Sequence, residues 1–323
     1  MKTKNKKNEI LFPKNQLQLY GYDDYFNTFI KLFSNNKLPN AILLSGPKGS
    51  GKATFAYHFI NYLLSRKENS NYSINKFTIN PQNKSYKNLC SNTHPNFYPL
   101  ENNLNEENIK IENVKNILKF LNKSTYNSNI KIVLIDNVEY LNISSANALL
   151  KALEEPSDNT FFFIIHNNSS AISETIKSRC VEFKIFHNLL EKKLILNNII
   201  KQYEYDINID ELDSNIYVES PGNIFKYLSI FNEIKLNDPK NILTSISYLI
   251  DQFKQKKDPQ LLNFISLFVE IFYKNLSLKN YKKLNIYFYN KHMILKLIND
   301  VKKFNLDKNN FFISLKGILQ NDS

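Results

Sequence analysis

The sequence predicts an α/β domain, in which a parallel sheet is covered by helices, followed by domains built from helices alone. Apolar runs typical of strands alternate with helix-spaced segments up to about residue 185, which is the pattern of parallel strands joined by helical crossovers. A glycine-rich turn joins the first such run to a helical stretch, and strand signals mostly vanish after residue 187. We therefore expect an α/β domain over 1–186, a small helical domain over 187–236 and a helical C-terminal domain over 237–323.

Short runs rich in Ile, Val, Leu and Phe predict the strands, because the strands of a parallel sheet are buried on both faces. The expected strands are 41–44, 97–100, 130–135, 161–165 and 181–186. Apolar residues spaced three or four apart predict the helices. The expected helices are 24–33, 54–64, 111–121, 146–155, 172–177, 189–203 and 222–231.

Three further features complete this prediction. Ser144 and Ser145 are candidate caps for the helix over 146–155, and Pro156 stops it. The polar segment 67–93 is predicted to be a long loop or a poorly ordered segment. From residue 241 onward helical spacing continues, and its apolar stripe is typical of core packing in a bundle. The stripe contains Phe264, Leu267, Phe268 and Ile271.

The glycine-rich turn is the strongest single signal in the chain. Three of the six glycines fall within six residues, at Gly46, Gly49 and Gly51, and Lys52 follows directly. Glycines let several backbone N–H groups converge on one point, and the start of the next helix adds positive potential. A lysine at this position reaches the outer phosphates of a nucleotide. The turn therefore predicts a phosphate-binding loop that holds ATP or ADP.

The residue after the lysine does not match the pattern of such loops. A hydroxyl is expected there as a Mg²⁺ ligand, and this chain has Ala53. Thr54 comes one residue late, about 100° further round a helix. We keep Thr54 as a candidate nucleotide contact and leave Mg²⁺ binding open.

A second mismatch lies at the end of the strand over 130–135. Asp136 ends this strand and is placed to help hold Mg²⁺ beside a nucleotide. The next residue is Asn137, and an amide cannot accept a proton as a general base. Glu139 is two residues further on, and we expect it to point elsewhere. Ala53 and Asn137 together predict that nucleotide is held without efficient hydrolysis.

The composition is that of a globular protein, with 42% hydrophobic and 22% charged residues in a chain of 323. No apolar run approaches the ~20 residues of a membrane span, and the polar N-terminus predicts no signal peptide. Two cysteines, Cys90 and Cys180, exclude a disulfide framework and fit a reducing cytoplasm. The net charge of +12 is spread along the chain, which favours a solvated lysine surface over a dedicated DNA groove.

Two segments carry a family resemblance. Residues 144–156 read SSANALLKALEEP, and residues 175–180 read TIKSRC after a single intervening strand. Weaker matches are Asn40-Ala41, His94-Pro95 and Ser220-Pro221-Gly222. The combination resembles the clamp-loader branch of the AAA+ proteins. The resemblance implies a P-loop AAA+ domain, a helical lid domain and an all-helical collar domain that joins subunits.

The resemblance also implies a role for Arg179, one of two arginines in the chain. In clamp loaders the arginine of the Ser-Arg-Cys turn reaches the ATP of a neighbouring subunit. The resemblance implies a non-hydrolysing subunit of the bacterial DNA polymerase III clamp loader. Its partners would be subunits of the gamma, tau and delta types, with contact to the sliding clamp and to primer-template DNA through the complex.

Besides Ala53 and Asn137, this chain departs from the clamp-loader pattern at two places. Many relatives carry four cysteines that bind zinc between the phosphate loop and the His-Pro pair. In this chain Cys90 is the only cysteine in that stretch, so we expect no zinc and no other metal cluster. Asn223 stands where hydrolysing relatives often have an arginine that touches nucleotide. Asn167 or Asn168 is the candidate for a γ-phosphate contact after the strand over 161–165.

Two alternatives stay open. One is an ATP-hydrolysing motor subunit of the gamma or tau type, which needs the hydroxyl and the glutamate that this chain lacks. The other is a small-molecule phosphoryl-transfer enzyme, in which the segments 147–156 and 178–180 would have no role.

Overall fold

The computed structural model describes residues 12–100, 109–123, 130–168, 170–205, 207–209, 212, 214–232, 242–256, 259–304 and 308–322. Its internal contacts divide the chain into two compact units. The first comprises Met1–Tyr203 with Ser220–Asn223, and the second comprises Glu204–Glu219 with Ile224–Ser323. Helix α8 (Leu189–Gln202) groups with the first unit. The three-domain division stays a prediction.

A five-stranded sheet with all strands parallel forms the centre of the first unit, as the sequence predicts. The strand order is β2-β3-β4-β1-β5. The strands are β1 (Ala41–Ser45), β2 (Phe97–Leu100), β3 (Lys131–Ile135), β4 (Thr160–His166) and β5 (Val181–Lys184). Each lies within a few residues of its predicted range. Because β1, β3 and β4 are neighbours, their carboxyl ends lie side by side.

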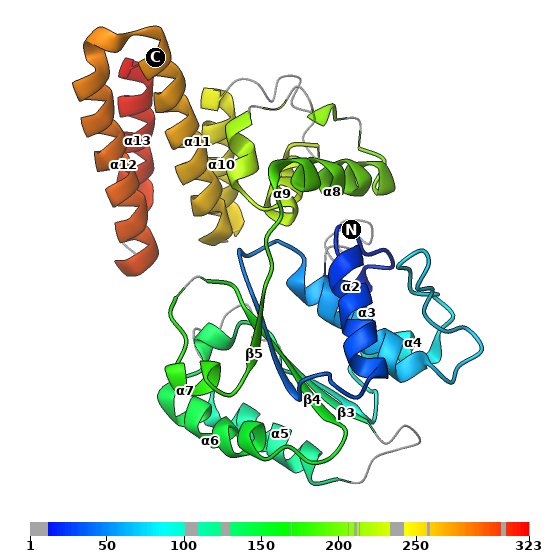
Figure 1. Ribbon diagram of the computed structural model, residues 1–323. Coiled ribbons are helices and arrows are strands. Elements are labelled where there is room, and N and C mark those ends of the chain that lie inside the picture. The colour runs from blue at the N-terminus through cyan, green and yellow to red at the C-terminus, as the bar shows by residue number, and fades with distance from the viewer. Residues whose placement is uncertain are drawn as a thin grey trace. The chain divides into compact units, whose positions relative to one another are not determined.

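One helix precedes β1, and other helices fill the connections between the strands. In the first unit these are α2 (Asp23–Ser34), α3 (Lys52–Ser65), α4 (Lys84–Cys90), α5 (Ile111–Leu121), α6 (Ile143–Glu154) and α7 (Glu174–Lys177). The short 3₁₀ turns of the chain are η1 (Pro13–Asn15), η2 (Val138–Tyr140), η4 (Ser214–Val218) and η5 (Tyr281–Lys283). Figure 1 shows α2, α3 and α4 on one side of the sheet and α5, α6 and α7 on the other.

Each face of the sheet carries its own core, because successive strand residues point to opposite faces. Ile42 and Leu44 join the cluster that includes α2 and α3, whereas Leu43 joins the cluster that includes α5 and α6. All three side chains are fully buried. Burial of each such side chain stabilises the fold by about 1.5–3 kcal/mol. The sheet is thus fixed from both sides, and its carboxyl edge is a rigid base for a site.

The structure corrects two local predictions. The segment 67–93, predicted as a loop, contains α4, whose first turn is capped by Asn83 accepting from the backbone N–H of Tyr86 at 2.6 Å. The helix predicted to begin after Ser144 or Ser145 begins at Ile143 instead. Its cap is Asn142, whose side chain accepts from the N–H of Ser145 at 2.8 Å. Asparagine caps helices as well as serine does, so the composition alone could not decide between them.

In the second unit every described element is helical. The helices are α9 (Pro221–Asn232), of which the first residues group with the first unit, α10 (Ile242–Lys256), α11 (Pro259–Lys279), α12 (Leu284–Phe304) and α13 (Lys308–Asp322). Phe264, Phe268 and Ile271 of the predicted apolar stripe are buried, which confirms their role in the core.

One stretch of α11, Leu261–Lys279, is long and apolar enough by length and composition alone to cross a membrane. The prediction that no apolar run approaches the length of a membrane span was therefore wrong for this stretch. Half of that stretch is buried inside the structure, and Ile265 and Val269 are fully buried. We therefore interpret α11 as a core helix of the bundle.

Candidate functional site

The glycine-rich loop lies between β1 and α3, where the sequence places it. Gly51 is the residue before the first turn of α3, and its backbone is left-handed at φ 98°. Gly49 is left-handed as well, at φ 81°. Residues with a Cβ rarely adopt this conformation. The tight loop therefore depends on glycine at these two positions.

Lys52 is folded back into its own loop. Its side chain is buried, and its ammonium donates to the carbonyl of Gly46 at 2.9 Å, to the carbonyl of Pro47 at 2.7 Å and to the hydroxyl of Ser50 at 3.3 Å. Burial lowers the pKa of Lys52 to about 8, although the charges of Asp136 and Glu139 act to raise it. A phosphate would have to displace hydrogen bonds that the loop already supplies.

Two side chains from other elements fix the carbonyl of Ser50. The Tyr22 hydroxyl donates to it at 3.1 Å, and Nε2 of His187 lies 3.2 Å from it. Both side chains are buried, and the two rings meet edge to face with centroids 5.3 Å apart. Burial lowers the pKa of His187, while its contact with the Ser50 carbonyl acts to raise it. No pattern in the sequence pointed to either residue.

A second group of contacts comes from the turn that opens α9. The hydroxyl of Ser220 donates to the carbonyl of Lys48 at 2.6 Å, and the backbone N–H of Gly222 donates to the carbonyl of Gly49 at 2.9 Å. A Cβ at Gly222 would lie 2.6 Å from that carbonyl oxygen. The Ser-Pro-Gly segment thus holds the outer side of the loop.

In the first turn of α3, Ala53 occupies the position where a Mg²⁺-binding hydroxyl is expected. Ala53 packs against the core beside α2 and α3. Thr54 is the next residue of the same helix and is half-buried. A side chain one residue further along a helix is rotated by about 100°, so Thr54 cannot take the place of a hydroxyl at position 53.

The residues after β3 lie beside those after β4. The side-chain amide of Asn167 donates to the side-chain oxygen of Asn137 at 2.8 Å. The backbone N–H of Asn167 donates to the carboxylate of Glu139, whose two oxygens lie 3.3 and 3.4 Å away. Glu139 thus faces the chain after β4, and whether it can take the role of a base stays a prediction. Its charge, like that of Asp136, also acts on Lys52, so the carboxyl edge of the sheet gathers two carboxylates and two amides near the loop.

Arg179 lies just beyond α7 and is bound to α6. Its Nε donates to the Glu154 carboxylate at 2.5 Å, and its Nη2 forms an ion pair with the same oxygen. Its Nη1 donates to the carbonyl of Thr175 at 2.8 Å and, more weakly, to the hydroxyl of Ser178 at 3.4 Å. Within the described residues it makes no hydrogen bond to the glycine-rich loop of its own chain. The structure thus separates Arg179 from the other predicted site residues.

The two cysteines are free and partly buried. Burial raises the pKa of Cys180 to about 11. His94 lies against Ser85, with Nε2 3.4 Å from the hydroxyl. Among the residues that the structure describes, no group of three histidine, cysteine or acidic side chains could hold a metal ion. The absence of zinc stays a prediction.

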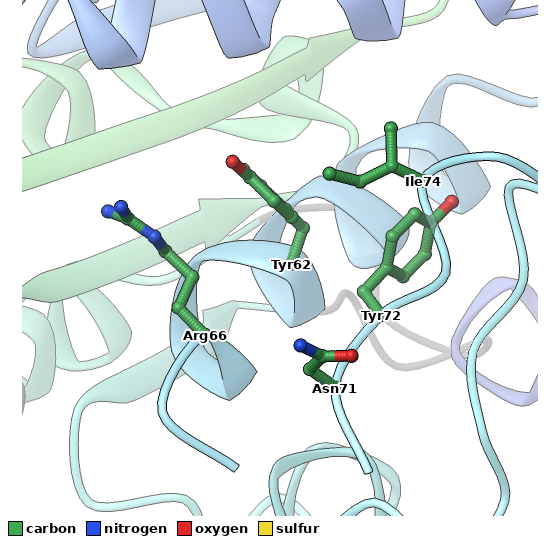
Figure 2. Close-up of a pocket in the computed structure, with 5 residues that line it drawn as sticks. All are labelled: Tyr62, Arg66, Asn71, Tyr72 and Ile74. Atoms are coloured by element: carbon green, nitrogen blue, oxygen red, sulfur yellow. The ribbon is translucent and has the colours of Figure 1, made fainter. Parts of the chain in front are cut away.

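A small pocket lies at the end of α3 and the loop beyond it. It is lined by Tyr62, Arg66, Asn71, Tyr72 and Ile74 and has a volume of about 190 Å³. Cofactor pockets usually have about 300–1,000 Å³ and polar groups that converge. Figure 2 shows the Arg66 guanidinium pointing away from Asn71 and Tyr72, and it lies over the ring of Phe33 at 5.0 Å. We therefore assign no ligand to this pocket.

Comparison with known proteins adds a family to this geometry. The family model described as "DNA polymerase III, delta subunit" matches residues 21–188, more than half of the chain. The DNA polymerase III subunit delta' of Pseudomonas aeruginosa is 34% identical over 143 residues, which cover 44% of this chain and 42% of that protein. The subunit delta' of Buchnera aphidicola subsp. Schizaphis graminum is 29% identical over 243 residues, covering 74% and 68%.

Two other known proteins are also similar to this chain, one over part of its length and one at low sequence identity. The subunit gamma of the same Buchnera is 33% identical over 165 residues, covering 51% of this chain and 42% of that protein. A DNA polymerase III gamma subunit-related protein of Thermotoga maritima, known from its crystal structure, is 15% identical with a TM-score of 0.46, covering 92% and 99%. The chain spans about half the length of most of the relatives that it matches by sequence.

Proposed function

Because the chain belongs to the family described as DNA polymerase III, delta subunit, we propose that it is a non-hydrolysing subunit of the bacterial clamp loader. In this role it supplies Arg179 to the ATP site of a neighbouring subunit while the sliding clamp is loaded at primed DNA. Most of its sequence relatives named above are delta' subunits.

The contacts of Lys52 carry the non-hydrolysing part of the proposal. The lysine that would reach the outer phosphates already donates to Gly46 and Pro47. Ala53 offers no hydroxyl to Mg²⁺, and Asn137 offers no base. ATP or ADP, if it binds, is held without the groups that turn it over.

The placement of Arg179 supports action on another subunit. Its side chain is 30% exposed, and its hydrogen bonds run to α6 and α7, not to the glycine-rich loop. An arginine that stabilises the charge developing on a transferred phosphate is worth about 10³–10⁵ in rate. Supplying such a group is a contribution that a subunit without turnover of its own can make.

The proposed partners follow from the family. They are clamp-loader subunits of the gamma, tau and delta types, with the sliding clamp and primer-template DNA reached through the complex, in the cytoplasm. Several apolar side chains of the second unit are exposed, as expected of a collar that joins subunits. They include Ile286, Phe288 and Tyr289.

One observation favours the motor alternative. Glu139 faces Asn167 at the carboxyl edge of the sheet, where a carboxylate could orient water. The gamma subunit relative is consistent with this alternative. Against it, the two oxygens of Glu139 accept the N–H of Asn167, and the hydroxyl after Lys52 is still missing.

The test is ATP turnover by the reconstituted loader with clamp and primed DNA, comparing wild type with Arg179→Ala and Lys52→Ala in this subunit. We expect Arg179→Ala to cut turnover at the site it completes by at least about 10³-fold and Lys52→Ala to have little effect. If Lys52→Ala is the damaging change and the purified chain hydrolyses ATP alone, the motor alternative is correct.

A further inference from the structure

We infer that Glu154 is a positioning residue for Arg179, holding the guanidinium so that its outer edge is presented to a phosphate of the neighbouring subunit. This inference rests on the proposed function. Glu154 belongs to the motif over 144–156, and the sequence alone assigned it no role.

The edge of the guanidinium that Glu154 occupies is what makes this role possible. A guanidinium carries five N–H donors in one plane. Nε and Nη2 meet the same oxygen of Glu154, which uses the edge nearest the side-chain stem. Nη1 turns back to the carbonyl of Thr175. Nη1 also makes a long contact of 3.4 Å to the Ser178 hydroxyl. The end formed by the outer N–H groups of Nη1 and Nη2 is not part of the Glu154 contact, and this end suits two phosphate oxygens.

The pair connects two elements that must keep their spacing. Glu154 is the last residue of α6, and Thr175 lies in α7, so Arg179 is tied to both helices. α6 and α7 share a core, in which Leu149 and Ile176 are buried. The contact with the Glu154 carboxylate therefore restricts the side chain of Arg179, which would otherwise sample many rotamers.

Stability alone is a poor explanation for the pair. The side chains of Arg179 and Glu154 are 30% and 45% exposed, and exposed ion pairs contribute little to folding. Preorganising a guanidinium lowers the entropy lost when it binds phosphate, because fewer rotamers must be excluded. A phosphate group also carries more charge than one carboxylate, so the ion pair with Glu154 orients Arg179 and does not prevent it from binding phosphate.

The next residue is a matched control. Glu155 has the same charge and length and is exposed. It follows the last residue of α6, and its backbone is no longer helical, at φ −125° and ψ 67°. Within the described residues its side chain makes no hydrogen bond or ion pair. A change there alters net charge by the same amount as a change at Glu154 and leaves Arg179 held.

The experiment uses the loader reconstituted from this chain and the gamma- and delta-type subunits, with clamp and primed DNA. We compare Glu154→Ala, Glu155→Ala, Arg179→Ala and the double variant Glu154→Ala/Arg179→Ala. Glu154→Ala should lower kcat for ATP about 10-fold with KM nearly unchanged, because a misplaced group costs rate and not ground-state binding. Glu155→Ala should match wild type, and the double variant should be no slower than Arg179→Ala.

The outcomes separate this inference from the proposed function. If Arg179→Ala slows turnover and Glu154→Ala does not, Glu154 has no positioning role and the proposed function stands. If Glu154→Ala slows turnover further in the Arg179→Ala background, it acts by another route and the inference is wrong. If Arg179→Ala leaves turnover unchanged, the proposed function itself fails. Unchanged thermal unfolding of the purified variants excludes a folding defect as the cause.

Discussion

The ammonium of Lys52 donates to the carbonyl of Pro47 at 2.7 Å, so the lysine of the glycine-rich loop is bound by the loop itself. The same group donates to Gly46, and its side chain is only 2% exposed. An ammonium so placed must satisfy its hydrogen bonds inside the protein, because water does not reach it. Burial lowers the pKa of Lys52, and these hydrogen bonds partly offset the cost of burying its charge, which leads to a testable pH dependence.

Stability should depend on pH through Lys52. Burial lowers its pKa to about 8 from the ordinary 10.5. Between these values the unfolded chain binds more protons than the folded one, so the free energy of unfolding rises with pH. Below pH 8 the cost of burying the charge is fully present. Lys52→Met should therefore flatten the pH dependence between pH 8 and 10 by about 2 kcal/mol relative to wild type.

Urea unfolding at several pH values measures this difference. Lys37→Met is the control, because Lys37 is exposed and its charge is not among those that act on Lys52. This variant should keep the slope of wild type. Equal slopes for wild type and Lys52→Met would show that the buried ammonium does not titrate in this range.

Gly51→Ala should destabilise the first unit. The φ angle of Gly51 is 98°, and a Cβ there would lie 3.2 Å from the ring of Tyr22. Strain of this kind costs about 1–3 kcal/mol. The control is Gly317→Ala in α13, where a Cβ meets no atom within 4 Å. That change should stabilise its helix by about 0.5–1 kcal/mol, so the two urea midpoints should move in opposite directions.

Glu68 should hold the start of α4. Its carboxylate accepts from the hydroxyl of Ser85 at 2.5 Å and from the backbone N–H groups of Lys84 and Ser85 at 2.9 and 3.0 Å. Glu68→Gln should cost about 1–2 kcal/mol, because hydrogen bonds to a charged acceptor are the stronger ones. Amide hydrogen exchange at Lys84 and Ser85 should become faster.

The control for Glu68 is Glu112→Gln. Glu112 is exposed and lies in the first turn of α5, and within the described residues its side chain makes no hydrogen bond or ion pair. Its interaction with the helix dipole should change stability by less than about 1 kcal/mol. Unchanged exchange at Lys84 and Ser85 in Glu68→Gln would show that the Asn83 cap and packing hold α4 without Glu68.

The sequence predicted the regular parts of the fold because their signals are local. Apolar runs identified all five strands, and helical spacing gave the helix over Ile111–Leu121 with its observed bounds. Within segment 67–93 the helix α4 was missed, because it is short and polar and its first N–H groups are held by Glu68, which lies outside the helix. A contact between residues so far apart in sequence has no local pattern.

The candidate site divides in the same way. Residue types at adjacent positions are enough to identify the glycine-rich loop, the missing hydroxyl at Ala53, the missing base at Asn137 and the motif around Arg179. The folded structure was needed to show that Lys52 is bound inside its loop, that Glu139 faces Asn167 and that Glu154 holds Arg179. Such contacts depend on where separate strands and helices bring their ends together, and a residue's neighbours in space are not its neighbours in the chain.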